Sequence, residues 1–401
     1  MLVTANFVIA GGFGIVAPAI PMFARSFDVS VTAASFVISA FAVTRLLFAP
    51  VAGRLVTRLG ERKVYISGLL IVAVSTGACA FAENYAQLVA FRSAGGIGST
   101  MFTVSAVALL IHLTPPTLRG RAAGLFGTGF LLGNVAGPLA GGGLIAISLK
   151  APFLAYSVAL IVAVLIVWVL LRRSTLIAAA DEDATPAVTL PDALREHSYR
   201  SALFANFATG WVIFGVRVSL VPLFITEVLR REESFAGIAF AVFAAANVIM
   251  LIPAGKLADT VGRKPLVLAG LVMSGSGTIW VGFSGSVPDF LMATVLAGVG
   301  TGLLTPPKQA TVADIVGSRG RGGPVLATFQ MAADVGAILG PIAAGVLADQ
   351  LSFAAALAVT GALSLVAALV WLPAKETLPA KDEPHHPTPE QACEFEASEQ
   401  R

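Results

Sequence analysis

The stretch Gly53-Arg-Leu-Val-Thr57-Arg-Leu-Gly60-Glu61-Arg62 is followed 202 positions later by the related stretch Gly255-Lys-Leu-Ala-Asp259-Thr-Val-Gly262-Arg263-Lys264. A near-constant spacing across several such pairs implies two homologous halves, and parallel repeats in a membrane chain are typical of transporters. Three further pairs recur 200 to 203 positions apart: Arg119-Gly-Arg121 with Arg319-Gly-Arg321, Gly133-x3-Gly137-Pro138 with Gly336-x3-Gly340-Pro341, and Pro21 with Pro222.

The composition is that of a membrane protein. Charged residues make up 12% of the 401 positions and apolar residues 56%, whereas soluble domains carry about 25% charged residues. Such a chain cannot cover itself with a polar surface, so its outside must face lipid. We therefore predict an all-α integral membrane protein with about 12 transmembrane helices in two pseudo-symmetric six-helix bundles. The apolar runs of roughly 20 residues that a span needs lie near 2–23, 33–52, 64–82, 86–111, 122–147, 152–171, 201–226, 235–254, 265–284, 289–313, 324–347 and 352–372.

The polar segments divide the chain into four parts. We predict an N-terminal bundle over 1–172, a cytoplasmic linker over 173–200, a C-terminal bundle over 201–372 and a disordered acidic cytoplasmic tail over 373–401. One set of short loops holds eleven Lys and Arg residues and the opposite set holds four. Because basic loops stay in the cytoplasm, we expect a multi-pass protein of the cell membrane with both termini cytoplasmic.

Several function classes are excluded by what the sequence lacks. Basic residues form no concentrated patch for nucleic acid. Cys79 and Cys393 offer neither a disulfide framework nor metal-ligand spacing, and we expect no metal site at His385 and His386. The sequence contains no nucleophile elbow and no phosphate loop. We therefore expect a monomer that is not an enzyme and has no cofactor, whose partners are membrane lipid, protons and a small-molecule substrate.

The repeated loop and the twelve spans resemble the major facilitator superfamily, and more closely its twelve-helix drug–proton antiporters. The resemblance covers roughly residues 2–372. In that family, contacts at this loop act as an inner gate, with the acid placed against the positive end of a helix; a helix that begins near Arg121 is the candidate partner. The alternative is a plain basic loop. The residues that match the motif are Gly255, Asp259, Gly262, Arg263 and Lys264.

The first-half copy of this loop lacks the acid. Thr57 stands at the position of Asp259, and Thr114 aligns with Asp314 at the end of the tenth span. Because both acids are missing together, we hypothesise that Asp259, Arg263 and Asp314 form one inner-gate cluster in the second half only.

The fifth span carries a glycine pattern that resembles the one associated with antiporters in this superfamily. Glycines recur every four residues from Gly129 to Gly141, which makes a smooth stripe where another helix can approach closely. Pro138 removes a backbone donor and allows a bend. Generic packing of small residues is the alternative interpretation. The motif positions are Gly124, Gly133, Gly137, Pro138, Gly141 and Gly142.

Five ionisable residues lie at membrane depth, where each is costly and is therefore a candidate for function. They are Arg45, Arg92, Arg217, Lys308 and Asp334. Arg92 resembles the family's arginine that is linked to proton transfer, although the usual glutamine is absent; alternatively, it extends to the membrane interface. Arg45, Arg217 and Lys308 are candidates for the substrate cavity; alternatively, the two arginines bind backbone carbonyls.

Asp334 is the one acid near the middle of a span. A carboxyl group buried there can take up or release a proton near neutral pH, which proton coupling requires. Gln330 shares its helix face and is a substrate-binding candidate. The alternative is a structural ion pair with Lys308. Because the cations outnumber Asp334 and the first span has no acid, we hypothesise a neutral or anionic substrate.

These observations predict a secondary active transporter that exports a small organic compound or drug by proton antiport, using the proton gradient as its energy source. A proton-coupled symporter or importer of a neutral or anionic metabolite is the main alternative. A channel would conduct without saturation, and a membrane sensor would carry a folded soluble domain, so both fit less well.

Overall fold

The computed structural model describes residues 2–113, 119–171, 189–316 and 323–378. Side chains at some helix ends within these ranges, Thr57 and residues 119–128 among them, are not described. The chain is helical throughout the described part. The helices are α1 (Leu2–Val16), α2 (Ala19–Arg25), α3 (Val31–Leu59), α4 (Glu61–Cys79), α5 (Tyr85–Leu113), α6 (Arg119–Ile147), α7 (Ala151–Leu171), α8 (Leu190–Arg195), α9 (His197–Gly210), the π-helix η2 (Trp211–Leu220), α10 (Val221–Glu227), α11 (Phe235–Ala258), α12 (Arg263–Phe283), α13 (Val287–Val316), α14 (Gly323–Gln350) and α15 (Phe353–Trp371).

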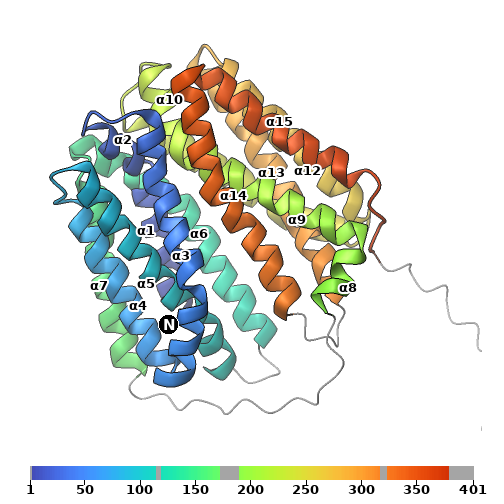
Figure 1. Ribbon diagram of the computed structural model, residues 1–401, viewed down its shortest axis with the longest axis horizontal. Coiled ribbons are helices and arrows are strands. Elements are labelled where there is room, and N and C mark those ends of the chain that lie inside the picture. Colours follow the sequence, from blue (N-terminus) through green and yellow to red (C-terminus); the bar gives the residue numbers. More distant parts are fainter. Residues whose placement is uncertain (1, 114–118, 172–188, 317–322, 379–401) are drawn as a thin grey trace, which may run out of the picture.

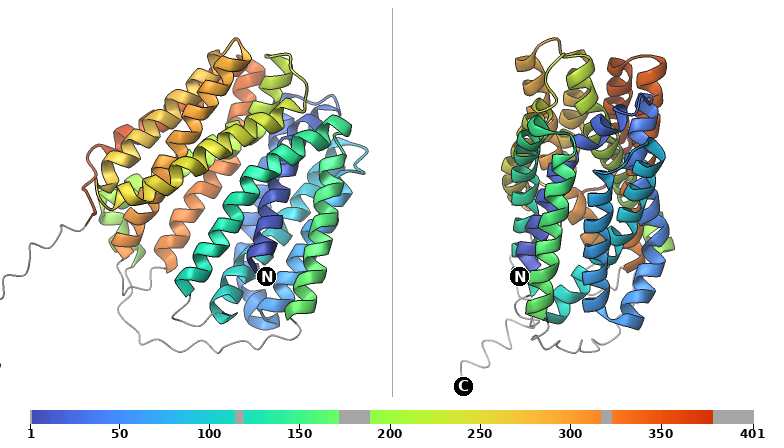
Figure 2. Two further views of the ribbon diagram at one scale, coloured as in Figure 1. Left: turned by 180° about the vertical axis from the view of Figure 1, so that it is seen from behind. Right: turned by 90° about the vertical axis from the view of Figure 1, so that its left-hand side faces the viewer.

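The helices form two groups, α1–α7 and α9–α15, as Figures 1 and 2 show. Among the described residues, ten helical stretches are long and apolar enough to cross a membrane. The helices α5 and α6 contain 29 residues each and complete two sets of six. The first span is made of α1 and α2, and the seventh of α9, η2 and α10.

Two glycines at equivalent positions make the tight turns of the repeated loop. Gly60 ends α3 with φ 82°, and Gly262 precedes α12 with φ 114°. Side chains with a Cβ atom disfavour this left-handed region. The glycines therefore allow consecutive helices to reverse direction within very few residues. We call the end of the molecule that carries these two turns the basic face, and the other end the opposite face.

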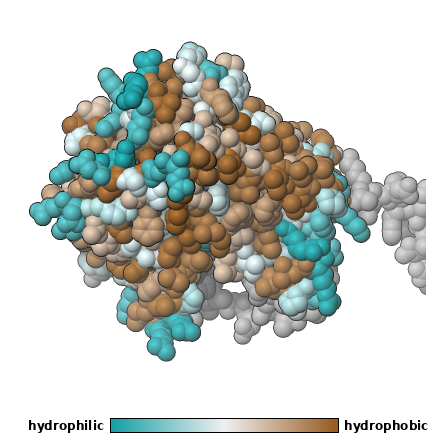
Figure 3. All heavy atoms as spheres, turned by 45° about the horizontal axis from the view of Figure 1, so that its top comes forward, coloured by the Kyte–Doolittle hydropathy of each residue, from teal (hydrophilic) through white to brown (hydrophobic). Residues whose placement is uncertain are grey.

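The outer surface is largely apolar. Large side chains such as Leu47, Ile147 and Ile249 are more than 70% exposed. Figure 3 shows apolar side chains over most of the visible surface, with hydrophilic ones gathered in separate patches. Burying this surface in hydrocarbon removes it from water, which is the force that holds such a chain in a membrane.

The glycine stripe of the fifth span packs α6 against α1. A Cβ atom added at Gly133, Gly137 or Gly141 would lie 2.2 to 2.6 Å from backbone atoms of α1. Gly336 and Gly340 of α14 make the equivalent approach to α9 and η2. A Cβ atom added at these positions would lie 2.2 and 3.0 Å from the nearest backbone atoms of the neighbouring helix. The predicted close approach of another helix is thus seen in both bundles.

The two bundles touch at the opposite face. The carboxylate of Asp349 at the end of α14 accepts the backbone N–H groups of Val31 (3.0 Å) and Thr32 (2.8 Å) at the start of α3. On the other side of the interface, Gly142 of α6 lies against Gly237 of α11. The ribbons of the two groups lie side by side here and diverge toward the basic face (Figure 1).

Two polar segments are more ordered than their composition suggests. The last part of the predicted linker contains α8 and the start of α9. Glu376, in the predicted tail, accepts the backbone N–H groups of Arg263 and Lys264 (3.0 Å each) at the start of α12. The helix N-terminus supplies the free donors. The remaining linker residues 173–188 and tail residues 379–401 lie outside the described residues, so the predicted domain boundaries stay predictions.

Candidate functional site

A cavity of about 490 Å³ lies between the bundles at mid-depth. Its wall comes mainly from α1, α3, α5 and α7 of the first bundle, and η2 and α14 close it from the second. This volume is typical of sites for small organic ligands. The wall is mostly apolar, and three charged side chains from the described part of the chain reach it: Arg45, Arg92 and Asp334.

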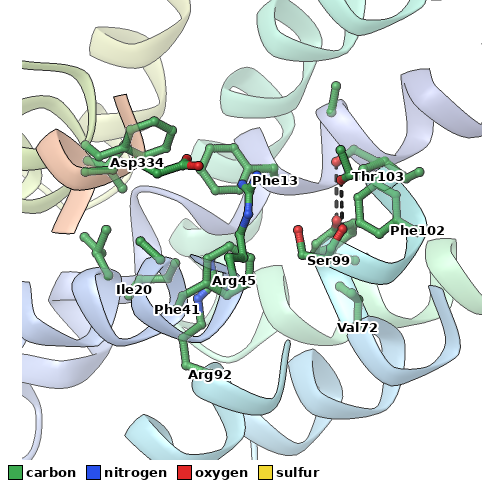
Figure 4. Close-up of a pocket in the computed structure, with 18 of the residues that line it drawn as sticks. Phe13, Ile20, Phe41, Arg45, Val72, Arg92, Ser99, Phe102, Thr103 and Asp334 are labelled. Atoms are coloured by element: carbon green, nitrogen blue, oxygen red, sulfur yellow. Dashed lines mark hydrogen bonds between the residues drawn. The ribbon is translucent and has the colours of Figure 1, made fainter. Parts of the chain in front are cut away.

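Asp334 and Arg45 reach the cavity from opposite bundles (Figure 4). Asp334 lies on α14 and shares a hydrogen bond with Gln330, one turn earlier on the same helix. Arg45 lies on α3 and acts electrostatically on Asp334. Neither makes an ion pair within 4.0 Å among the described residues. The two predicted residues therefore line one cavity from different bundles without forming an ion pair.

Arg92 forms a largely buried part of the cavity wall. Its side chain is 6% exposed, and its guanidinium carbon lies 4.1 Å from the ring centroid of Phe41. This cation–π contact keeps it at the cavity rather than at the membrane interface. Phe243, 202 positions after Phe41, carries a similar stack with Arg217 at 3.4 Å. The second arginine comes from η2 and not from the equivalent of α5.

Two of the predicted cavity cations lie elsewhere. Arg217 is buried inside the second bundle, as described above. Lys308, 2% exposed, donates a hydrogen bond to the hydroxyl of Thr209 (2.9 Å). Neither lines the cavity of this structure. Lys308 also makes no ion pair with Asp334, so the structural pair considered as an alternative is not formed in this conformation.

Only part of the predicted inner-gate cluster is together. The guanidinium group of Arg263 forms an ion pair with Asp314 and donates to the carbonyl oxygen of Ala310 (2.9 Å). Asp259 caps the end of α11, is exposed and makes no ion pair within the described residues. Its expected partner, the start of α6, lies where side chains are not described, as does Gly124. The role of this cluster stays a prediction.

Most of the cavity wall could not be recognised in the sequence. The aromatic side chains that line it resemble those that face lipid, and only packing separates the two groups. Ser99 and Thr103, joined by a hydrogen bond between the Thr103 hydroxyl and the Ser99 carbonyl (2.8 Å), add polar atoms on α5. The aromatic residues of the wall are Phe13, Phe41, Phe102, Tyr156 and Phe214.

The arrangement of two bundles around a central cavity agrees with the sequence comparison. The profile of the Major Facilitator Superfamily matches residues 2–230 and again residues 202–397. The chain belongs to the Major Facilitator Superfamily. It is a multi-pass membrane protein and a secondary transporter of a small-molecule substrate, and not an enzyme.

Relatives of this superfamily protein include drug pumps. It is 25% identical over 361 residues to Multidrug resistance protein 2 of Bacillus subtilis, covering 87% of this chain and 88% of that one. It is 25% identical to the multi-drug resistance efflux pump PmrA of Streptococcus pneumoniae, covering 88% and 90%. The synaptic vesicular amine transporter of Mus musculus is 26% identical, covering 80% of this chain and 62% of that one.

Solved structures of the superfamily share the fold. A bacterial homolog of the human lysosomal transporter Spinster, in an inward-facing and unoccupied conformation, superimposes with a TM-score of 0.77 at 18% identity, covering 92% and 94% of the two chains. A POT family transporter in complex with a peptide conjugate gives a TM-score of 0.75 at 11% identity, covering 92% and 94%. At these identities the likeness concerns the fold alone.

Proposed function

We propose that the protein exports a small organic compound across the cell membrane in exchange for protons, by alternating access. One observation carries this proposal: Asp334 is the one carboxylate that reaches the cavity between the bundles within the described residues. A proton and a hydrogen-bonding or cationic group of the substrate can each occupy this carboxylate, but not both at once. Competition of this kind couples the two movements in opposite directions.

The glycine pattern of α6 and the names of the efflux-pump relatives support export. The contacts at the opposite face support a state open toward the basic face. We place the basic face and both termini in the cytoplasm, because of the excess of basic loops there. The chain functions as a monomer in this account, since one copy contains a complete cavity.

A second candidate is proton symport of a neutral or anionic metabolite, and Arg45 and Arg92 on the cavity wall favour it. An anion that takes Arg45 away from Asp334 would favour a proton on that carboxylate, so both would move together.

Flux into proteoliposomes with an imposed pH gradient tests the proposal. Export by exchange predicts that substrate moves against the direction of the protons and that Asp334→Asn abolishes the coupling. The exposed Glu83 provides a matched control, because Glu83→Gln changes a carboxylate to an amide far from the cavity. Substrate movement in the same direction as the protons would replace exchange with symport, and unsaturable conduction would contradict both.

A further inference from the structure

The charges on the cavity wall form an open pair. Arg45 and Asp334 come from different bundles, act on each other electrostatically and form no ion pair, so the cavity space is lined by two unlike charges. In Figure 4 both side chains point into this space. A ligand that enters it meets a cation on one bundle and an anion on the other.

A ligand with a single charge cannot satisfy both residues. A cation that pairs with Asp334 leaves Arg45 without its opposite charge, and an anion that pairs with Arg45 leaves Asp334 without its own. Leaving one charge of a pair uncompensated in a poorly hydrated site is unfavourable, whereas replacing both partners is close to neutral. The pair therefore selects a ligand that carries both signs.

The rest of the wall defines the remainder of the ligand. Phe13, Phe102 and Phe214 add aromatic rings to the wall of the same cavity, and the volume leaves room for a body of one or two rings. Arg92, stacked on Phe41, adds a second positive charge on the side of Arg45. This extra charge disfavours a ligand with net positive charge and offers the anionic group a second partner.

We infer that the substrate is a small zwitterion with an aromatic or other apolar body, whose anionic group binds at Arg45 and whose ammonium group binds at Asp334. The inference rests on the proposed function, since it names the substrate of that cavity. It also explains exchange, because the ammonium group and a proton exclude one another at Asp334. Such a ligand joins the two bundles through its two charges.

Matched sets of probes test the inference on the purified full chain. Each set contains an aromatic zwitterion, its deaminated acid and its decarboxylated amine, for example L-tryptophan with indole-3-propionate and tryptamine, and the corresponding sets from L-phenylalanine and L-tyrosine. Binding is measured by thermal stabilisation and by competition with the radiolabelled zwitterion. At least one zwitterion should bind roughly tenfold more tightly than both of its partners, which corresponds to one satisfied charge.

Variants assign the two charges separately. Arg45→Gln should remove the preference for the zwitterion over the amine. Asp334→Asn should remove the preference for the zwitterion over the acid. Arg58→Gln changes an exposed residue on α3, the helix that carries Arg45, and should leave both preferences unchanged. In the wild type, zwitterion affinity should fall as the pH drops from neutral to mildly acidic. The neighbouring groups that act on Asp334 are Arg45 of α3 and Gln330 of its own helix.

The outcomes separate this inference from the proposed function. Tighter binding of an amine or an acid than of its zwitterion, failure of every zwitterion to bind, or an unchanged preference in Arg45→Gln would overturn the inference. Flux in proteoliposomes reports on the function independently. A zwitterion that binds but is not carried contradicts transport and keeps the binding inference, whereas carriage of tryptamine alone keeps transport and removes the inference.

Discussion

Arg25 and Glu227 occupy equivalent positions in the two halves, and their side chains form an ion pair with 3.0 Å between Nε and Oε1. Each ends a seven-residue helix, α2 or α10, and they lie 202 positions apart. Asp28 and Arg230 are also 202 positions apart, with the acid in the first half and the base in the second. Both adopt left-handed backbone conformations (φ 56° and 53°). Identical halves would place like charges here, so divergence between the halves has converted a repulsive contact into an attractive one at the opposite face.

Reversing one charge of this pair should favour opening of the opposite face. Arg25→Glu or Glu227→Arg should raise the labelling rate of a cysteine at Ala337, in the cavity, by an impermeant thiol reagent added from the opposite face. The change should be up to several-fold, because partly exposed ion pairs contribute about 0.2–1 kcal/mol. The double reversal should restore the wild-type rate. A double variant that labels as fast as the single ones would contradict the pairing.

Glu376 should stabilise the start of α12 in a pH-dependent manner. Burial raises the pKa of its carboxyl group, but N–H groups of Leu378, Arg263, Lys264 and Thr377 outweigh this and hold the pKa below its ordinary value of 4.5. A depressed pKa contributes stability that is present above the ordinary value and is lost as the pH falls through the lowered one. Glu376→Gln should therefore lower the melting temperature at neutral pH by a few degrees.

The control for this experiment is pH itself. As the pH falls through the lowered pKa of Glu376, the wild-type carboxyl group becomes protonated, so the difference between wild type and variant should shrink. A difference in melting temperature that persists undiminished under acid conditions would argue that Glu376 acts through packing and not through its charge.

The acid of the repeated loop should matter in one half only. Asp259→Asn should slow transport severalfold, because an acid against the positive N-terminal end of a helix, expected here to be α6, contributes about 0.3–1 kcal/mol. Thr57→Ala, at the equivalent position of the first half, should leave the rate near that of the wild type. Initial rates in proteoliposomes measure both. Equal activity of the two variants would count against a gate role for Asp259.

The α1–α6 contact should not tolerate a methyl group. At Gly137 a Cβ atom would lie 2.2 Å from the carbonyl oxygen of Gly11, whereas at Gly143 it would meet open space. Gly137→Ala should destabilise the protein by about 1–3 kcal/mol, as overpacking does, and Gly143→Ala should not. Thermal unfolding in detergent compares the two variants. Equal melting temperatures of the two variants would contradict the prediction, because α1 and α6 could then move apart without loss of stability.

The repeat and its turns could be predicted from the sequence because their causes are local. Gly60 and Gly262 must be glycine where the backbone turns left-handed, and the spacing between them recurs along the chain. Asp334 could be singled out as a candidate for proton coupling for a similar reason, since a lone acid at membrane depth has few tolerable environments. The role of such residues can be inferred because few structural environments tolerate them.

Other site residues depend on packing that the sequence does not show. Arg217 was expected at the cavity from its depth, but the π-helix changes the phase of the helix faces around it, and its side chain enters the second bundle. Phe13 and Phe102 line the cavity, yet an aromatic residue in an apolar span looks the same whether it faces lipid, a neighbouring helix or substrate. The close packing of one bundle against the other decides among these.

Opposite movements of the two faces are the most direct test of alternating access. Spin labels at Glu83 and Gly285 report on the opposite face, and labels at Arg58 and Thr260 on the basic face, with Cys79 and Cys393 replaced. The distance between the two labels at each face is then measured by pulsed electron–electron double resonance in nanodiscs, and the wild type is compared with Arg25→Glu. The account predicts that the first distance lengthens while the second shortens; distances that change in the same direction, or at one face alone, would contradict it.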